Sequence, residues 1–190
     1  RWCYSSSKAV VEHYLLGASQ AKELSSIIVR LFNVYGPRSR TSGTYGAVFG
    51  VFLAQKISEQ PYTVVGDGNQ TRDFTFVSDV ARAFILASKS LFTSEIYNVG
   101  SNNTISINKL VELISEGKIN KVFIPARPGE PQCTYADISK INNDLKWTPL
   151  IDIENGVRKV LAKIDYWKKA PVWTAESISK ETEDWFKYLK

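Results

Sequence analysis

Two side chains that could do chemistry together lie near the start of the chain. Tyr4 and Lys8 are four residues apart, at the beginning of a stretch with helical periodicity. Residues at positions i and i+4 lie on the same face of a helix, so the phenol and the ammonium can share one site. A nearby cation favours the ionised form of an acid, and a phenol beside a lysine is therefore a better base at neutral pH. The spacing predicts an acid–base pair, although a surface tyrosine and a solvated lysine would show the same short pattern.

The composition is that of an ordinary soluble globular protein. The chain has 190 residues, of which 44% are hydrophobic and 23% are charged, and this length fits one domain or one and a half. We find no apolar run of about eighteen residues and no leading signal segment, so we predict no membrane span and a cytoplasmic location. The sequence does not begin with Met and starts inside a motif, which suggests a piece of a longer protein.

Few residues are suited to metal binding, disulfide bonds or nucleic-acid binding. Cys3 and Cys133 lie far apart without a framework spacing, so we expect two free thiols in a reducing compartment. His13 is the only histidine, which gives no basis for a zinc site or a Ser-His-Asp triad. The net charge of +5 comes from cations mixed with acids, whereas a nucleic-acid binder would cluster its cations. A small polyanionic ligand explains a few well-placed arginines equally well.

Helical and strand-like segments alternate along the chain, which indicates an α/β architecture. Gly17 is expected to weaken or bend the first helix, and Ser78 or Asp79 to cap the third. Asp73 and Asp79 are expected to have structural roles. We expect a buried strand at 25–37, further strands at 62–66, 95–101 and from 121, a loop at 38–46, and helices at 9–21, 47–60, 76–90, 106–117, 138–147, 154–170 and 177–190.

Five motifs follow one another in a fixed order. They are YSSSK at 4–8, RLFNVYGPR at 30–38, YTVVGDGNQTRDFTFVSDVARA at 62–83, EIYNVGS at 95–101, and RPGEP with YADISK within 127–140. This ordered set resembles the extended short-chain dehydrogenase/reductase family, and within it the nucleotide-sugar epimerases and dehydratases. The motifs cover nearly the whole chain, and GDGNQTRDF and RPGE are far more specific than the tyrosine–lysine pair.

The resemblance implies the C-terminal part of a Rossmann-like doubly wound parallel sheet plus a smaller α/β substrate-binding domain. Residues 1–60 would belong to the NAD-binding domain, whose N-terminal glycine-rich part precedes the matched motifs in proteins of this kind. Residues 61–190 would form mainly the substrate domain, with interleaved Rossmann elements. We therefore expect the chain to be inactive alone, to form a homodimer through residues 9–16 only when full length, and to expose apolar surface by itself.

The resemblance also implies roles in a reaction with NAD, or with NADP as the alternative. Tyr4 would take the proton of a sugar hydroxyl as hydride leaves for the cofactor. Lys8 would hold the phenolate and the nicotinamide ribose, for which an ammonium has three donors. Phe32 would flank the nicotinamide, although it fits a core position equally well.

The substrate implied by the resemblance is a UDP- or dTDP-sugar. Its pyrophosphate needs cations and neutral donors, and the planar fork of arginine matches phosphate oxygens. The matching positions are Asn33, Arg72 and Arg127 for the pyrophosphate, Glu130 for a ribose hydroxyl, and the backbone of Thr63 and Val65 for the base.

The most specific hypothesis is a UDP-hexose 4-epimerase. A 4,6-dehydratase or a UDP-glucuronate decarboxylase of the same fold is the first alternative. A non-catalytic relative that binds nucleotide sugar or only dimerises is an alternative of another class, and the intact Tyr4 and Lys8 argue against it. A nucleic-acid-binding domain, suggested only by the basic net charge, is the weakest.

Overall fold

The computed structural model describes residues 3–39 and 48–188 of the chain. The first half contains α1 (Cys3–Gln20), β1 (Ile27–Leu31), β2 (Val34–Tyr35), α2 (Val48–Ile57), β3 (Tyr62–Val65), β4 (Thr71–Arg72), β5 (Thr75–Phe76), α3 (Val77–Lys89) and β6 (Glu95–Val99). The second half contains β7 (Ile105–Ser106), α4 (Ile107–Ser115), β8 (Lys121–Ile124), β9 (Cys133–Thr134), α5 (Ser139–Leu145), α6 (Ile153–Leu161), the 3-10 helix η1 (Ile164–Trp167), α7 (Ala175–Glu181) and α8 (Glu183–Tyr188). A loop was expected at 38–46, and its residues from position 40 onward lie outside the described residues.

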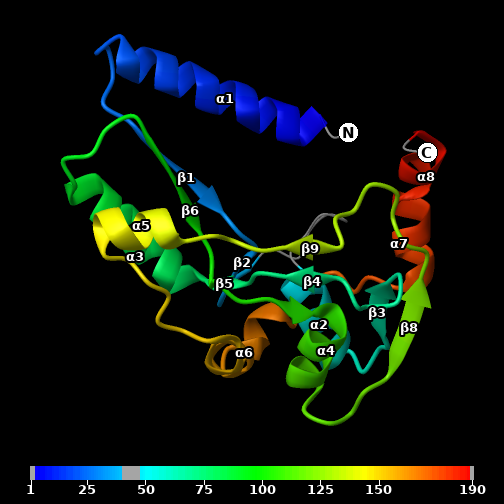
Figure 1. Cartoon of the computed structure of the whole chain (residues 1–190). Helices are drawn as coiled ribbons and strands as arrows, with labels where there is room; N and C mark the ends of the chain where they lie inside the picture. The colour runs from blue at the N-terminus through cyan, green and yellow to red at the C-terminus, as the bar shows by residue number, and fades with distance from the viewer. Residues whose placement is uncertain (1–2, 40–47, 189–190) are drawn as a thin grey trace.

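Parallel strand pairs dominate the sheets. β1 pairs with β6, β2 with β5, β3 with β8 and β4 with β9, all in parallel, whereas β7 pairs antiparallel with β4. Parallel neighbours need crossover connections, which usually contain helices, and helices lie between most of these paired strands along the chain (Figure 1). The predicted α/β fold class is confirmed.

The elements pack around two hydrophobic cores. The first core joins α2, α4 and α6 to β3 around Tyr35, whose ring stacks on Phe49 with centroids 4.4 Å apart. The second core joins α3 and α5 to β1 and β6 around Trp147, which is fully buried. The division into domains at residues 60 and 61 stays a prediction.

Three helices differ from their expected form. The helix expected at 154–170 is divided into α6 and the 3-10 helix η1. α1 runs without interruption through Gly17. The helix expected at 177–190 is divided into α7 and α8 around Thr182, which is buried. The Thr182 hydroxyl donates to the carbonyl of Ile178 at 2.7 Å, and such bonding to the preceding turn disturbs a helix.

Two buried acidic side chains have structural roles, as predicted. Asp73 is fully buried and accepts the backbone N–H of Ser101 at 2.6 Å. Asp79, 1% exposed, accepts the backbone N–H groups of Leu150 and Ile151, both at 3.0 Å. These carboxylates join segments that are far apart in the sequence, because buried polar groups need partners.

The predicted cap of the third helix is wrong. α3 begins at Val77, directly after β5, and Phe76 occupies the N-cap position without a side-chain hydrogen bond. Ser78 and Asp79 therefore lie inside the first turn. The carboxylate of Asp79 accepts the backbone N–H groups of the loop at 150–151, and it also accepts the Arg82 side chain of its own helix at 3.2 Å.

The strand expected at 25–37 is shorter and less buried than predicted. It is divided into β1 and β2, and the side chain of Leu31 in β1 is 45% exposed. Among the described residues β1 pairs only with β6. A parallel strand is buried when elements cover both of its faces, and here the described elements cover β1 incompletely.

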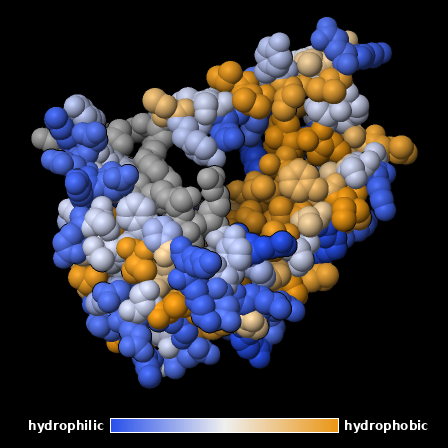
Figure 2. Space-filling view, turned by 180° about the vertical axis from the view of Figure 1, so that it is seen from behind, coloured by the Kyte–Doolittle hydropathy of each residue, from blue (hydrophilic) through white to orange (hydrophobic). Residues whose placement is uncertain are grey.

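Apolar side chains are exposed along α1, as expected for this chain. Val10, Val11 and Tyr14 are 65%, 54% and 80% exposed. Figure 2 shows hydrophobic side chains gathered over one end of the molecule, around α1 and the neighbouring strands. None of the helices within residues 3–39 and 48–188 combines the length and apolarity needed to cross a membrane.

Candidate active site

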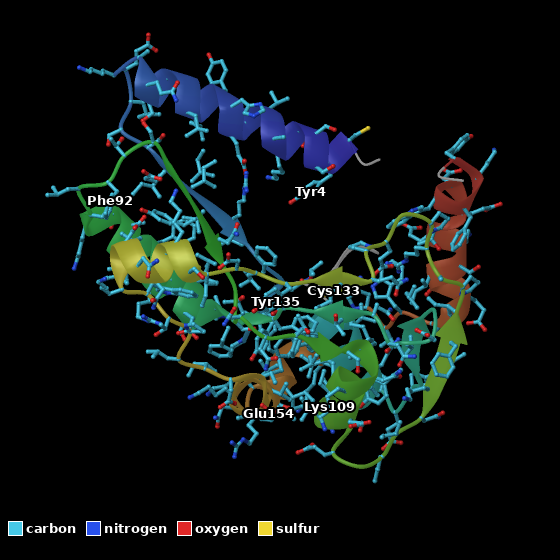
Figure 3. All side chains as sticks on the ribbon, viewed as in Figure 1. Tyr4, Phe92, Lys109, Cys133, Tyr135 and Glu154 are labelled. Carbon is cyan, nitrogen blue, oxygen red and sulfur yellow. The ribbon has the colours of Figure 1, made fainter. Side chains whose placement is uncertain are left out.

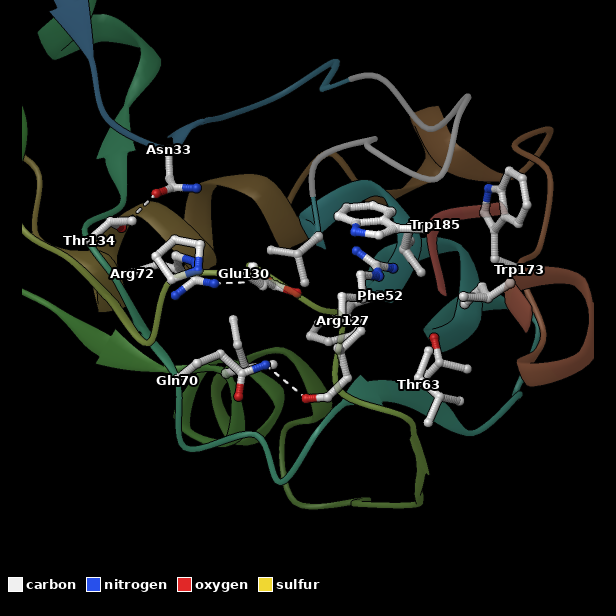
Figure 4. Close-up of a pocket in the computed structure, with 18 of the residues that line it drawn as sticks. Asn33, Phe52, Thr63, Gln70, Arg72, Arg127, Glu130, Thr134, Trp173 and Trp185 are labelled. Atoms are coloured by element: carbon white, nitrogen blue, oxygen red, sulfur yellow. Dashed lines mark hydrogen bonds and ion pairs between the residues drawn. The ribbon is translucent and has the colours of Figure 1, made fainter. Parts of the chain in front are cut away.

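A wide cavity lies between the N-terminal end of α1, strands β3 and β4, and the C-terminal helices α7 and α8 (Figure 4). Its volume is about 1190 Å³, which exceeds the range of about 300–1,000 Å³ usual for small-molecule pockets. Seven of the nine site residues predicted from the sequence line it, namely Tyr4, Asn33, Thr63, Val65, Arg72, Arg127 and Glu130.

The tyrosine–lysine pair stands at one side of this cavity. The Nζ atom of Lys8 lies 5.4 Å from the centroid of the Tyr4 ring, so the predicted stacking at i and i+4 is present. The Tyr4 side chain is 70% exposed and extends from α1 toward the body of the molecule (Figure 3). Lys8 is exposed and is not among the residues that line the cavity.

An ion pair between a buried arginine and a partly exposed glutamate connects two motifs that are far apart in the sequence. Nη2 of Arg72 donates to Oε1 of Glu130 at 2.8 Å, and Nη1 donates to the carbonyl of Thr71, also at 2.8 Å. Arg72 is only 8% exposed. The other carboxylate oxygen of Glu130, Oε2, is buried and has no hydrogen-bond partner among the described residues. A buried acceptor without a donor is costly, and this one can accept a bond from a ligand hydroxyl.

Strand pairing and a glycine turn place this ion pair. Arg72 in β4 pairs with Thr134 in β9, which brings the preceding loop with Glu130 beside it. The turn before β4 requires Gly68, which has φ 76° and would clash with Asn108 if it carried a Cβ atom, at 2.6 Å.

Asn33 reaches the same cavity from the end of β1. Its Oδ1 atom accepts the hydroxyl of Thr134 at 3.1 Å, which ties the two strand ends together (Figure 4). Open α/β sheets bind ligands at the carboxyl ends of their strands, and Asn33 lies two residues beyond the end of β1.

Two glutamines make hydrogen bonds to β3, the strand whose backbone was expected to bind the nucleotide base. Gln55 is fully buried, donates to the Thr63 hydroxyl at 2.8 Å and accepts the Thr63 backbone N–H at 3.2 Å. Gln70 donates to the carbonyl of Val65 at 2.8 Å. Burial raises the pKa of the neighbouring Tyr62 to about 12, so this phenol stays protonated at neutral pH. Sequence reasoning missed both glutamines. Gln55 follows the apolar run at 51–54, which could have indicated a buried position, whereas the polar neighbours of Gln70 gave no such signal.

The wall of the cavity also contains two tryptophans, which sequence reasoning missed. Trp173 and Trp185 line the cavity from the C-terminal segment. The guanidinium carbon of Arg127 lies 5.3 Å from the centroid of the Trp185 ring, and Figure 4 shows the two side chains close together. The sequence indicated only that Trp185 lies within the helix expected at 177–190.

Phe32 does not line the cavity. Its ring is partly buried and packs against the second core, around Tyr97 and Val99. A role beside a nicotinamide therefore stays a prediction for this residue.

Comparison with known proteins identifies the family of this chain. The family model described as GDP-mannose 4,6 dehydratase matches residues 1–160. The UDP-glucuronate 4-epimerase of Thermodesulfobacterium geofontis is 33% identical over 169 residues, which cover 87% of this chain and 48% of the relative. The chain spans about half the length of the curated relatives it matches. It belongs to the nucleotide-sugar epimerase/dehydratase family of extended short-chain dehydrogenases/reductases.

Solved structures agree with this assignment. The UDP-N-acetylglucosamine 4-epimerase of Methanobrevibacter ruminantium, in complex with UDP-N-acetylmuramic acid, has a TM-score of 0.80 and 31% identity, covering 85% of this chain and 53% of that structure. The UDP-glucuronic acid 4-epimerase of Bacillus cereus, in complex with UDP-glucuronic acid and NAD, has a TM-score of 0.74 and 31% identity, covering 81% and 49%. These similarities confirm the Rossmann-like class of the fold.

Proposed function

We propose that this chain is the substrate-binding and acid–base part of an NAD-dependent nucleotide-sugar 4-epimerase that acts on a UDP-hexose. The observation that carries the proposal is the cavity, which gathers Tyr4 with the predicted ligand-binding residues of three other motifs. Relatives named as UDP-sugar 4-epimerases support the reaction class.

The nucleotide end of the substrate would lie toward Arg72, Arg127 and Glu130. Arginine forks suit pyrophosphate oxygens, and the buried Oε2 of Glu130 would accept a ribose hydroxyl, which gives it a missing partner. The backbone of Thr63 and Val65 would receive the base.

The sugar end would lie toward α1. The Tyr4 phenolic oxygen would take the proton of the sugar hydroxyl and later return it. The Lys8 ammonium, which sits near the Tyr4 ring, would stabilise the phenolate electrostatically and donate to a ribose hydroxyl of the cofactor. When bound, NAD would supply the hydride acceptor and donor for this chemistry.

Tyr4 lines the cavity that would hold the sugar, whereas Lys8 lies outside it on the same helix. This arrangement would let Lys8 reach a nicotinamide cofactor bound beside the cavity. NADP is the alternative cofactor. We also propose that the full-length protein is cytoplasmic and forms a homodimer through residues 9–16, whose apolar side chains are exposed on α1.

The test is turnover by the full-length gene product with NAD. UDP-glucose, UDP-N-acetylglucosamine, UDP-glucuronate and dTDP-glucose are incubated separately, and the anomeric signals of the sugar are followed by NMR. We expect a second epimer that grows to equilibrium. Tyr4→Phe should lower the rate at least about 10²-fold, since it removes the general base. Tyr166→Phe, at an exposed tyrosine outside the cavity, should leave the rate unchanged.

Other products would replace the proposal with a specific alternative. A keto-deoxy sugar would indicate a 4,6-dehydratase, which the description of the matching family model favours. A pentose with released CO₂ would indicate a decarboxylase. Binding of nucleotide sugar and NAD without any conversion would restrict the function to binding.

A further inference from the structure

The C-terminal segment of the chain belongs to the cavity although the family model does not include it. The model match ends at residue 160, whereas η1, α7 and α8 all follow that position. This segment supplies Trp173, Ile178 and Trp185 to the cavity wall.

The segment is packed against the body of the protein at several points. The indole N–H of Trp167, 1% exposed, donates to the carbonyl of Ser39 at 3.2 Å. Gln55 donates to the carbonyl of Trp173 at 2.7 Å. Ile178 is 6% exposed, and α7 packs against β8. These contacts fix η1 and α7 against the body of the protein, and α8 follows α7 directly after Thr182.

Trp185 makes two contacts with the loop that carries Arg127. Its Nε1 atom donates to the carbonyl of Pro128 at 3.2 Å. Its ring lies 5.3 Å from the guanidinium carbon of Arg127, which is within the range of a cation–π interaction. The Arg127 carbonyl also accepts the backbone N–H of Glu130 at 3.2 Å. The indole therefore contacts both the backbone and the charged end of this loop.

We propose that Trp185 is a positioning residue that holds the Arg127 guanidinium in the orientation in which it binds the pyrophosphate of the nucleotide. An arginine side chain loses rotamer freedom when it binds a phosphate, and a stack that fixes it beforehand lowers this cost. The inference rests on the proposed nucleotide site and adds the residue that preorganises it.

The test compares two ligands that differ in the phosphates. UDP and uridine are titrated against the 190-residue chain, and binding is followed by ligand-observed NMR, which also detects weak ligands. Trp185→Ala should weaken UDP binding about 3- to 30-fold, the range that corresponds to a cation–π contact. Uridine affinity should stay within about twofold, because the effect passes through a phosphate contact. Tyr188→Ala, an exposed position of the same helix, should change neither affinity.

A double-mutant cycle tests the coupling directly. In an Arg127→Ala background, Trp185→Ala should cause no further loss of UDP affinity. Additive losses, or equal losses for UDP and uridine, would overturn the inference and would indicate direct contact with the base or a general disturbance of the fold. If Trp185→Ala does not fold, Trp185→Leu replaces it in the same cycle, since leucine retains apolar bulk but removes the aromatic face that contacts Arg127. Failure of the wild-type chain to bind UDP would refute the proposed nucleotide site itself, whereas UDP binding that is insensitive to Trp185→Ala would refute only the positioning role.

Discussion

Gln55 should be one of the most important side chains for the stability of this chain. It is fully buried in α2, and its amide makes three hydrogen bonds, two with Thr63 and one with the carbonyl of Trp173. In Gln55→Ala the Thr63 hydroxyl can rotate and water can reach the half-buried Trp173, but the buried Thr63 N–H keeps no acceptor. At about 1–3 kcal/mol for an unsatisfied buried group, this orphaned N–H lowers the free energy of unfolding by about 1–3 kcal/mol.

Urea denaturation followed by tryptophan fluorescence and far-UV circular dichroism measures this loss. Gln60→Ala is the matched control, because Gln60 lies three residues beyond α2, is exposed, and makes one long bond of 3.4 Å to a nearby carbonyl. The control should stay within about 0.5 kcal/mol of the wild type. If Gln55→Ala were as stable as Gln60→Ala, the argument that this amide joins α2, β3 and the C-terminal segment would be refuted.

Two further predictions concern packing and pH. A Cβ atom at Gly156 would lie 1.8 Å from the hydroxyl of the buried Tyr35. Gly156→Ala should therefore lower the free energy of unfolding by about 1–3 kcal/mol, despite the better helix propensity of alanine. The control Gly17→Ala, with open space around it, should instead raise the thermal midpoint, and a higher midpoint for Gly156→Ala would contradict the packing argument. The hydrogen bonds from Arg30 lower the pKa of Glu12 from its ordinary value of 4.5. The ion pair between α1 and β1 therefore stabilises the fold above that value and loses its effect as the pH falls through the lowered pKa. The stability difference between wild type and Glu12→Gln, about 0.2–1 kcal/mol, should disappear in acid, and a difference that stays constant from pH 7 to pH 3 would exclude this linkage.

Local patterns in the sequence predicted much of the fold. Helical periodicity and turn residues predicted most elements, and Ser106 caps α4 as its position before that helix suggested. The ordered motifs predicted the α/β class and the family, which the comparisons confirm. The spacing of Tyr4 and Lys8 alone predicted that their side chains would meet, because a helix fixes the geometry of positions i and i+4.

Contacts between distant segments could not be predicted in the same way. The sequence indicated that Asp79 was structural but placed it at a helix cap, whereas its carboxylate accepts two backbone amides in the distant loop at 150–151 as well as the Arg82 side chain. It gave no sign of the bond from Gln55 to Trp173, 118 positions away.

The sequence by itself therefore determined the family, the order of the elements and the chemistry available at each motif. Only the tertiary structure decided that Arg72 pairs with Glu130, 58 positions away, and that Trp185 stands over Arg127. The physical reason is that helical periodicity, caps and tight turns depend on neighbouring residues. The partner of a buried polar group depends instead on strand register and on the packing of whole elements.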